Sequence, residues 1–218
     1  AGKVLAIETV SDSIYSGALN EVYVGEKYDI WKVFFKQYSM AFFAAYFMLI
    51  LSVITIVFST VLRSWYKMDM EIAYLGWGLL LASLWLFSNS RIRQFFVSNT
   101  SVMAAVGFMV VMLLPYPYLS YVNKVQKGRY RKVYTWVALL TFVNFVVSVI
   151  LQLCNVTDFL NIMMSSHLVI LLLVIAYIIT ILLDVRNGKI KEYREVGFGF
   201  VGLILAAVWE IYLVYQPT

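Results

Sequence analysis

The sequence is poor in the residues that build metal sites and soluble enzymes. It holds one cysteine, one histidine and three prolines, and 13% of its 218 residues are charged, against roughly 25% in soluble domains. The single cysteine, Cys154, excludes a disulfide within the chain. The single histidine, His167, has no neighbouring cysteine or carboxylate cluster and makes a poor metal site. No Walker loop, nucleophile elbow or His-Glu-x-x-His motif is present, so we expect no catalysis, metal or cofactor.

Apolar residues make up 62% of the sequence, and the mean hydropathy is +0.83. They form long uninterrupted runs, which are typical of membrane-spanning helices and not of the alternating strands of a β-barrel. A helix needs ~20 apolar residues to cross a bilayer. Six runs qualify: residues 39–62, 72–88, 102–122, 134–154, 159–183 and 196–214. We predict an all-α membrane protein whose residues 38–218 form a six-helix transmembrane bundle.

Residues 1–37 differ from the rest. Short β-prone runs at 4–10 and 21–24 flank a Ser/Asp/Gly-rich stretch, which predicts a remnant of an extracytoplasmic β domain or a small cap. After it, Asp29 is predicted to cap a helix that lies in the membrane interface and continues into the first span.

Two spans carry residues that affect packing. Gly78 and Ala82, four residues apart in the second span, predict a close approach of helices. Pro115 and Pro117 predict that the third span kinks or ends near its last turn.

The charges of the loops predict the orientation. The loops after the first, third and fifth spans hold eleven lysines and arginines, whereas those after the second and fourth hold only Arg91 and Arg93. By the positive-inside rule the basic loops are cytoplasmic and the N-terminus is outside. The net charge of +5 therefore orients helices, and we expect the bilayer and not nucleic acid as partner.

The hairpin from Tyr134 to Leu183 contains the candidate site. Its first span carries a polar stripe at helical spacing, and its second carries Ser165, Ser166 and His167. In the sixth span, Glu210 is predicted at a similar depth to His167, and ionisable groups inside a membrane usually face the bundle and pair. The stripe consists of Thr141, Asn144, Ser148 and Gln152.

Two interpretations of these residues stay open. One is an outward-facing ligand or proton site formed by Glu210, His167, Gln152, Ser148 and Asn144, with Arg91 and Arg93 at its mouth. The other is a structural polar cluster that joins helices, with Glu210 snorkelling to the interface.

Several segments together resemble a known family. They are Gly76-Trp77-Gly78 leading to Leu84-Trp85-Leu86-Phe87-Ser88, then Gln94-Phe95-Phe96, Leu113-Leu114-Pro115, Tyr118-Leu119 and Asp184-Val185-Arg186-Asn187-Gly188. With the β segment ending in Val22-Tyr23-Val24-Gly25, this layout resembles the bacterial seven-transmembrane receptors with diverse intracellular signalling modules, above all the sensor halves of diguanylate cyclases.

The resemblance implies a homodimeric receptor in the bacterial cytoplasmic membrane that binds an extracytoplasmic small molecule or protein. It also implies a seventh span and a cytoplasmic output domain, such as a GGDEF cyclase or a histidine kinase. Neither is present in this sequence, so we expect both to lie beyond Thr218. The alternatives are a small-solute transporter or channel, and a structural subunit of a membrane complex.

Overall fold

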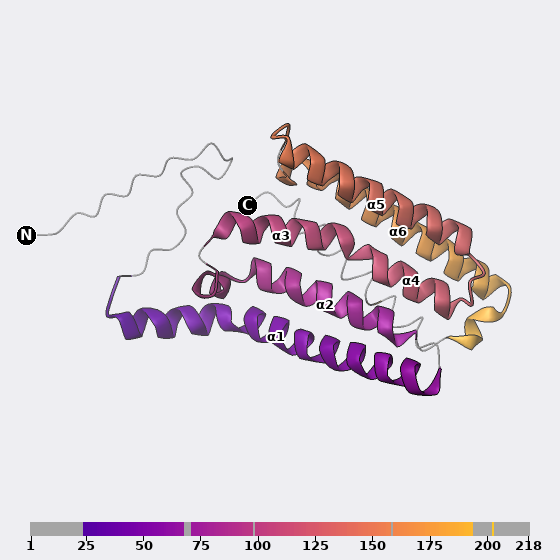
Figure 1. The fold of residues 1–218 in the computed structure, drawn as a ribbon, viewed down its shortest axis with the longest axis horizontal. Helices are drawn as coiled ribbons and strands as arrows, with labels where there is room; N and C mark the ends of the chain where they lie inside the picture. Colours follow the sequence, from indigo (N-terminus) through magenta and orange to yellow (C-terminus); the bar gives the residue numbers. More distant parts are fainter. Residues whose placement is uncertain (1–23, 68–70, 98, 158, 194–201, 203–218) are drawn as a thin grey trace, which may run out of the picture.

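In the computed structural model of the chain, residues 24–67, 71–97, 99–157, 159–193 and 202 are described, and every regular element among them is a helix (Figure 1). The helices are α1 (Lys27–Tyr66), α2 (Ile72–Asn89), η1 (Arg91–Phe95), α3 (Thr100–Leu113), α4 (Pro115–Val125), α5 (Arg131–Leu153), α6 (Phe159–Arg186) and η2 (Lys189–Glu192). The β-prone runs up to residue 23 and the predicted span 196–214 lie outside the described residues.

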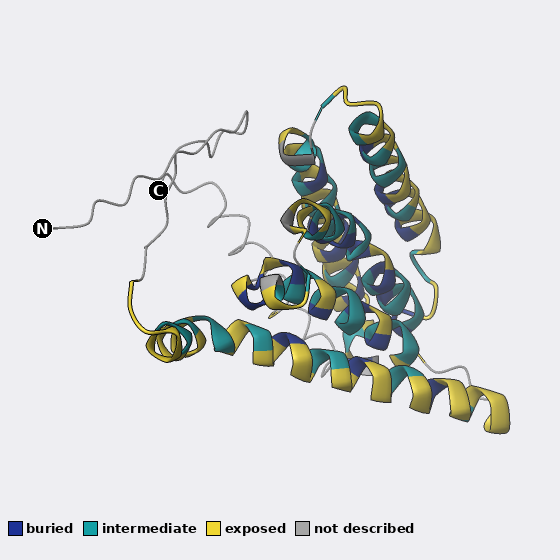
Figure 2. Cartoon of the chain, turned by 60° about the vertical axis from the view of Figure 1, so that its left-hand side comes forward, coloured by how far each residue is buried: buried dark blue, intermediate teal, exposed yellow. Residues whose placement is uncertain are grey.

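Five segments are long and apolar enough to cross a membrane: α1, α2, the combined segment Ser101–Val125, α5, and Asn161–Arg186 of α6. Large apolar residues are exposed along them, with exposed fractions of 61% for Phe47 and 61% for Leu182, and Figure 2 shows such exposed stretches in yellow on the helices. In water such a surface would be costly, whereas in a bilayer it faces lipid. The chain is therefore a multi-pass membrane protein with an all-helical bundle.

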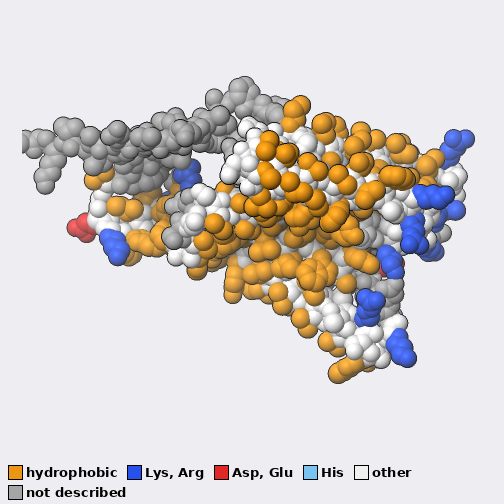
Figure 3. Space-filling view, turned by 45° about the horizontal axis from the view of Figure 1, so that its top comes forward, with side chains coloured by type: hydrophobic (Ala, Val, Ile, Leu, Met, Phe, Trp, Pro, Cys, Tyr) orange, Lys and Arg blue, Asp and Glu red, His pale blue; other side chains and the backbone are white. Residues whose placement is uncertain are grey.

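The helices run up and down in sequence order (Figure 1). α1 forms one edge and packs on α2, α2 packs on α3 and α4, and the α5–α6 pair covers α3 and α4 from the other side. We call one end of the bundle the basic end, because lysines and arginines gather there (Figure 3). The other is the hairpin-loop end, where the α5–α6 connection lies. The basic end carries Arg63, Lys67, Lys124, Lys127, Arg129, Arg131, Lys132, Arg186, Lys189 and Lys191.

The first helix contains both the predicted interfacial helix and the predicted first span. α1 is continuous over 40 residues, and its N-cap is Glu26, which makes no side-chain cap bond. The prediction that Asp29 caps this helix is wrong, because the helix begins at Lys27. Asp29 instead lies in the first turn, where its negative charge is favourable beside the positive end of the helix dipole.

Small residues let α1 and α2 approach closely. The buried residues of α1 are Ala45, Ser52 and Ser59, seven residues apart, so they lie along one face of the helix. Opposite them, a Cβ added to Gly76 of α2 would lie 2.9 Å from Cγ1 and 3.3 Å from the backbone nitrogen of Ile56. Only glycine fits there without a shift of α1.

The expected close approach at Gly78 has a different partner. A Cβ at Gly78 would lie 3.0 Å from Cζ of Tyr118, so this glycine makes room for a tyrosine ring of α4 and not for a helix backbone.

The proline break occurs in the middle of the third span and not near its last turn, which corrects the prediction. α3 ends at Leu113 and α4 begins at Pro115, with eleven further helical residues. Pro115 and Pro117 have no N–H, so two bonds of the helical ladder are missing. Leu114 keeps right-handed helical angles, φ −53° and ψ −38°, so the chain continues across the break.

Candidate functional site

The α5–α6 hairpin places its polar residues inside the bundle. Thr141 and Ser148 of α5 are buried, and Asn144 and Gln152 are half-buried. The predicted polar stripe therefore faces the protein and not the lipid. A hydroxyl or amide in this position needs a partner, because lipid provides none.

Asn144 joins the two helices of the hairpin. Its Nδ2 donates a hydrogen bond of 3.0 Å to Oγ of Ser166. Oγ of Ser165 lies 2.8 Å from Oδ1 of Asn144 and 2.7 Å from the carbonyl oxygen of Ile162, so its one proton serves either acceptor. We call Asn144, Ser165 and Ser166 the Asn144 cluster.

One turn further along α5, Ser148 is fully buried, and its Oγ has no hydrogen-bond partner among the described residues. Gln152 of α5 and His167 of α6 are half-buried at the same end of the hairpin. Ser148, Gln152 and His167 thus lie on the two helices that carry the Asn144 cluster.

The two predicted mouth residues lie on η1, which packs against α1 and α2. The Arg91 guanidinium donates a 2.7 Å hydrogen bond to the hydroxyl of Tyr38 and lies 4.6 Å from the centre of its ring. Arg91 is thus engaged with α1, while Arg93 is half-buried on the same short helix. Glu210 lies outside the described residues, and its role stays a prediction.

At the basic end, Asp184 is a fully buried carboxylate near the end of α6. Its Oδ2 accepts a 2.9 Å hydrogen bond from Nη2 of Arg129, with which it forms a salt bridge, and a 2.5 Å bond from the hydroxyl of Tyr193. Its Oδ1 accepts a 3.0 Å bond from the hydroxyl of Tyr130. Three donors thus replace the water that this charge loses on burial.

The hydrogen bonds continue from Tyr193 into the bundle. Because the Tyr193 proton goes to Asp184, its oxygen accepts from Nε2 of Gln126 at 3.3 Å. Oε1 of Gln126, which is fully buried, then accepts from the hydroxyl of Tyr134 at 2.7 Å. The Tyr134 hydroxyl also lies 2.7 Å from Oγ1 of Thr180. We call the seven residues the Asp184 network: Gln126, Arg129, Tyr130, Tyr134, Thr180, Asp184 and Tyr193.

This network ties together every element at its end of the hairpin. Gln126 follows α4, Tyr134 belongs to α5, and Thr180 and Asp184 belong to α6. Tyr193 follows η2 and returns the chain to Asp184. Separating α5 from α6, or η2 from α6, would break at least one of these polar contacts.

Two glycines make the required turns possible. Gly128 has φ +72° and its N–H donates 2.7 Å to the carbonyl oxygen of Asn123, which closes the end of α4 and delivers Arg129 to Asp184. Gly188 has φ +68° and turns the chain from α6 into η2. Positive φ is unfavourable for residues with a Cβ, so glycine is suited to both positions.

Burial and the neighbouring carboxylate change the acidity of the two tyrosines outside the spans. Burial, followed by its hydrogen bond to Asp184, raises the pKa of Tyr193 to about 12. The same two causes raise the pKa of Tyr130 above the ordinary tyrosine value. Both hydroxyls are therefore neutral at physiological pH and act as donors to the carboxylate.

The Asp184 network was not predicted from the sequence, in which Arg129 stood only among the orienting charges and Asp184 only within a family-like segment. A signal was present, because Tyr177, Thr180 and Asp184 repeat at helical spacing and Asp184 is the one acidic residue in α6. The contact of Tyr193 with Asp184 depends on the turn at Gly188, which local pattern does not specify.

Within the described part of the chain, no three His, Cys, Asp or Glu side chains are grouped so that they could hold a metal ion. Comparison with known protein families, with curated proteins and with solved structures gives no match.

Proposed function

We propose that this chain is the membrane sensor module of a signalling receptor. A signal at the hairpin-loop end changes the packing of α5 against α6, and α6 carries the change to the Asp184 network at the basic end. The observation that carries the proposal is that α6 is one uninterrupted helix with polar interhelical contacts at both ends. Ser165 and Asp184 are nineteen residues apart, about 28 Å along the helix.

Two polar clusters joined by one rigid helix favour a protein that switches between two packing arrangements. Hydrogen bonds between helices are either made or broken, so each cluster favours discrete arrangements and not continuous ones. A ligand that binds better to one arrangement shifts the population toward it. In this proposal the Asp184 network holds the resting arrangement, because four chain elements meet there.

The orientation and partners follow from the charge pattern and the family resemblance. We place the basic end in the cytoplasm and the N-terminus outside, in a bacterial cytoplasmic membrane. The resemblance supports a homodimer, an extracytoplasmic small molecule or protein as ligand, and a cyclase or kinase output beyond Thr218.

The ligand site in this proposal opens at the hairpin-loop end. Ser148 supports it, because a buried hydroxyl with no partner among the described residues has a hydrogen bond to offer. We assign Asn144, Gln152 and His167 to its wall, and keep Glu210 as a member from the sixth span. Arg91 and Arg93 are retained as candidates for the outer rim.

The test is whether the two ends of the hairpin are energetically coupled. Hydrogen exchange of the chain in lipid nanodiscs, followed by mass spectrometry, is compared for wild type, Asn144→Leu and Asp184→Asn. We expect Asn144→Leu to raise exchange in residues 126–134 and 184–193, and Asp184→Asn to raise it in residues 144–157, because coupling between sites is reciprocal.

Leu140→Ala and Arg186→Gln are the matched controls. Leu140 lies on α5 and Arg186 on α6, both are exposed, and neither belongs to a cluster. Their effects should stay local. If the Asn144 and Asp184 variants also change exchange only near themselves, the sensor proposal fails.

A transporter is the second candidate, and the break between α3 and α4 favours it. Discontinuous helices in mid-membrane are common at transport sites, and Asp184 would be the proton-carrying group. Purified chain in liposomes containing a pH-sensitive dye, under an imposed membrane potential, should then conduct protons, and Asp184→Asn should abolish the flux. If the wild-type chain carries no proton flux, the proton-transport proposal fails and the sensor proposal stands.

A further inference from the structure

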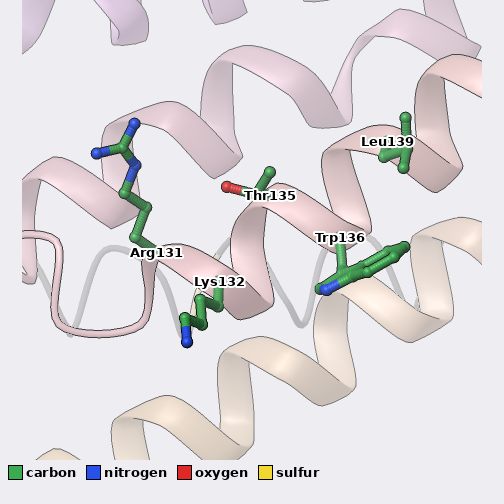
Figure 4. Close-up of a pocket in the computed structure, with 5 residues that line it drawn as sticks. All are labelled: Arg131, Lys132, Thr135, Trp136 and Leu139. Atoms are coloured by element: carbon green, nitrogen blue, oxygen red, sulfur yellow. The ribbon is translucent and has the colours of Figure 1, made fainter.

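A groove on the outer face of α5 combines cationic and apolar residues (Figure 4). It has a volume of about 530 Å³ and is lined by Arg131, Lys132, Thr135, Trp136 and Leu139. All five side chains are exposed, and the tryptophan is 67% exposed. The groove lies at the basic end, on the side of α5 that faces away from the Asp184 network.

The polar and apolar groups are arranged in order of depth. Arg131 and Lys132 occupy the first turn of α5, and Leu139 is eight residues further, about 12 Å along the helix. Beyond the groove the apolar surface continues, since Leu140 and Val143 have exposed fractions of 47% and 48%. The groove therefore has cations at its surface end, and its other end continues into the exposed apolar surface of α5, which suits acyl chains.

The two cations have no counter-charge nearby on their own helix. The first turn of α5 contains no acidic residue, and the carboxylate of Asp184 is already bound by Arg129. No hydrogen bond or salt bridge of the Arg131 or Lys132 side chain occurs among the described residues. A complementary occupant needs a negative charge at the top and a hydrocarbon chain below.

We propose that this groove binds an anionic phospholipid of the leaflet at the basic end. In Figure 4 the Arg131 and Lys132 side chains extend to opposite sides of the first turn of α5, so the phosphate binds at the surface end of the groove, where either flexible cation can turn toward it, and the Thr135 hydroxyl on the Arg131 side is a further donor. One acyl chain runs down over Trp136 and Leu139. A zwitterionic lipid fits the apolar part equally well, but it lacks the net charge that the two cations select.

Trp136 provides a direct measurement, because acyl chains that carry bromine quench tryptophan fluorescence on contact. The chain is placed in bilayers that contain brominated phosphatidylglycerol or brominated phosphatidylcholine at equal mole fraction. The sequence has six tryptophans, so the Trp136 signal is the difference between wild type and Trp136→Phe. We expect stronger quenching of this signal by the anionic lipid.

The charge dependence is tested with a matched pair of double variants. Arg131→Gln with Lys132→Gln removes both cations of the groove, whereas Arg186→Gln with Lys189→Gln removes two exposed cations of the same end outside it. Each cation near an anionic lipid contributes about fivefold. The groove variant should reduce the preference for phosphatidylglycerol at least fivefold, and the control should keep it.

Three results would overturn the proposal. Equal quenching by both lipids means that the groove holds only bulk lipid. An equal loss in the control pair means that the preference belongs to the whole basic end. No quenching of the Trp136 signal by either lipid means that protein, and not lipid, covers this face.

Discussion

The hydroxyl of Tyr193 donates a hydrogen bond of 2.5 Å to Oδ2 of Asp184, nine residues earlier in the chain. This contact holds η2 against the end of α6, and Arg129 binds the same oxygen from the α4–α5 connection. The position of three elements therefore depends on one carboxylate.

Asp184→Asn should lower the free energy of unfolding by about 3 kcal/mol. The variant leaves the largely buried Arg129 guanidinium without its carboxylate, and removing one member of a buried ion pair costs about 3–5 kcal/mol. The measurement is thermal or denaturant unfolding in detergent. Arg186→Gln, on the same end of α6 but exposed, is the control and should have little effect.

The same pair predicts non-additivity. Arg129→Gln combined with Asp184→Asn should destabilise the protein by less than the sum of the two single changes, because the double variant leaves no uncompensated buried charge. Additive effects would show that the two side chains do not depend on each other.

Tyr193 should ionise at a higher pH than an ordinary tyrosine. Its pKa is raised from 10.0 to about 12, so its contribution to stability is complete below about pH 10 and is lost as the pH rises through about 12. Absorbance at about 295 nm in detergent, titrated for wild type and Tyr193→Phe, isolates this group. A difference signal already complete near pH 10 would contradict the prediction.

Gly76→Ala should loosen the contact between α1 and α2. The new methyl would lie 2.9 Å from Cγ1 of Ile56, and overpacking of this kind costs about 1–3 kcal/mol. The better helix propensity of alanine offsets up to about 1 kcal/mol of it. Unfolding in detergent measures the net loss, and Gly25→Ala, whose nearest neighbour would be 3.9 Å away, should be neutral.

Chemical labelling of the two ends tests the orientation. Cys154 is exposed beside the α5–α6 loop, and it is the one cysteine of the chain. A membrane-impermeant maleimide added to intact cells should label it. With Cys154→Ser and Lys189→Cys, labelling should require permeabilised cells. The reverse pattern would place the basic end outside.

Hydropathy was sufficient to find the five described spans, because the cost of exposing backbone to lipid leaves few alternatives to a long apolar helix. Most span ends differed by a few residues, as in the fourth span, predicted at 134–154 and found at Arg131–Leu153. The exception is α1, which begins at Lys27, twelve residues before the predicted start of the first span. The helical spacing of the polar stripe predicted that its residues share one face of α5, and the structure adds that this face points inward. The six-helix count stays a prediction, because residues 196–214 lie outside the described part of the chain.

The sequence predicts less well which side chains contact each other. Whether Gly76 or Gly78 meets a helix backbone depends on how α2 is rotated between α1 and α4, and both fit a small-residue pattern. The Asp184 network combines residues from 126 to 193, and its geometry is set by the turns at Gly128 and Gly188. Local periodicity does not contain that information.

The length of α1 has a mechanical consequence. Forty helical residues measure about 60 Å, twice the ~30 Å hydrocarbon core, and no break interrupts them. Near its start Trp31 stacks on Phe95 of η1, with ring centres 4.3 Å apart, and further along it rests on α2 through Ala45, Ser52 and Ser59. One rigid helix thus connects η1 to Arg63 at the basic end, and a displacement of its first turns beside η1 would reach the basic end without crossing a loop.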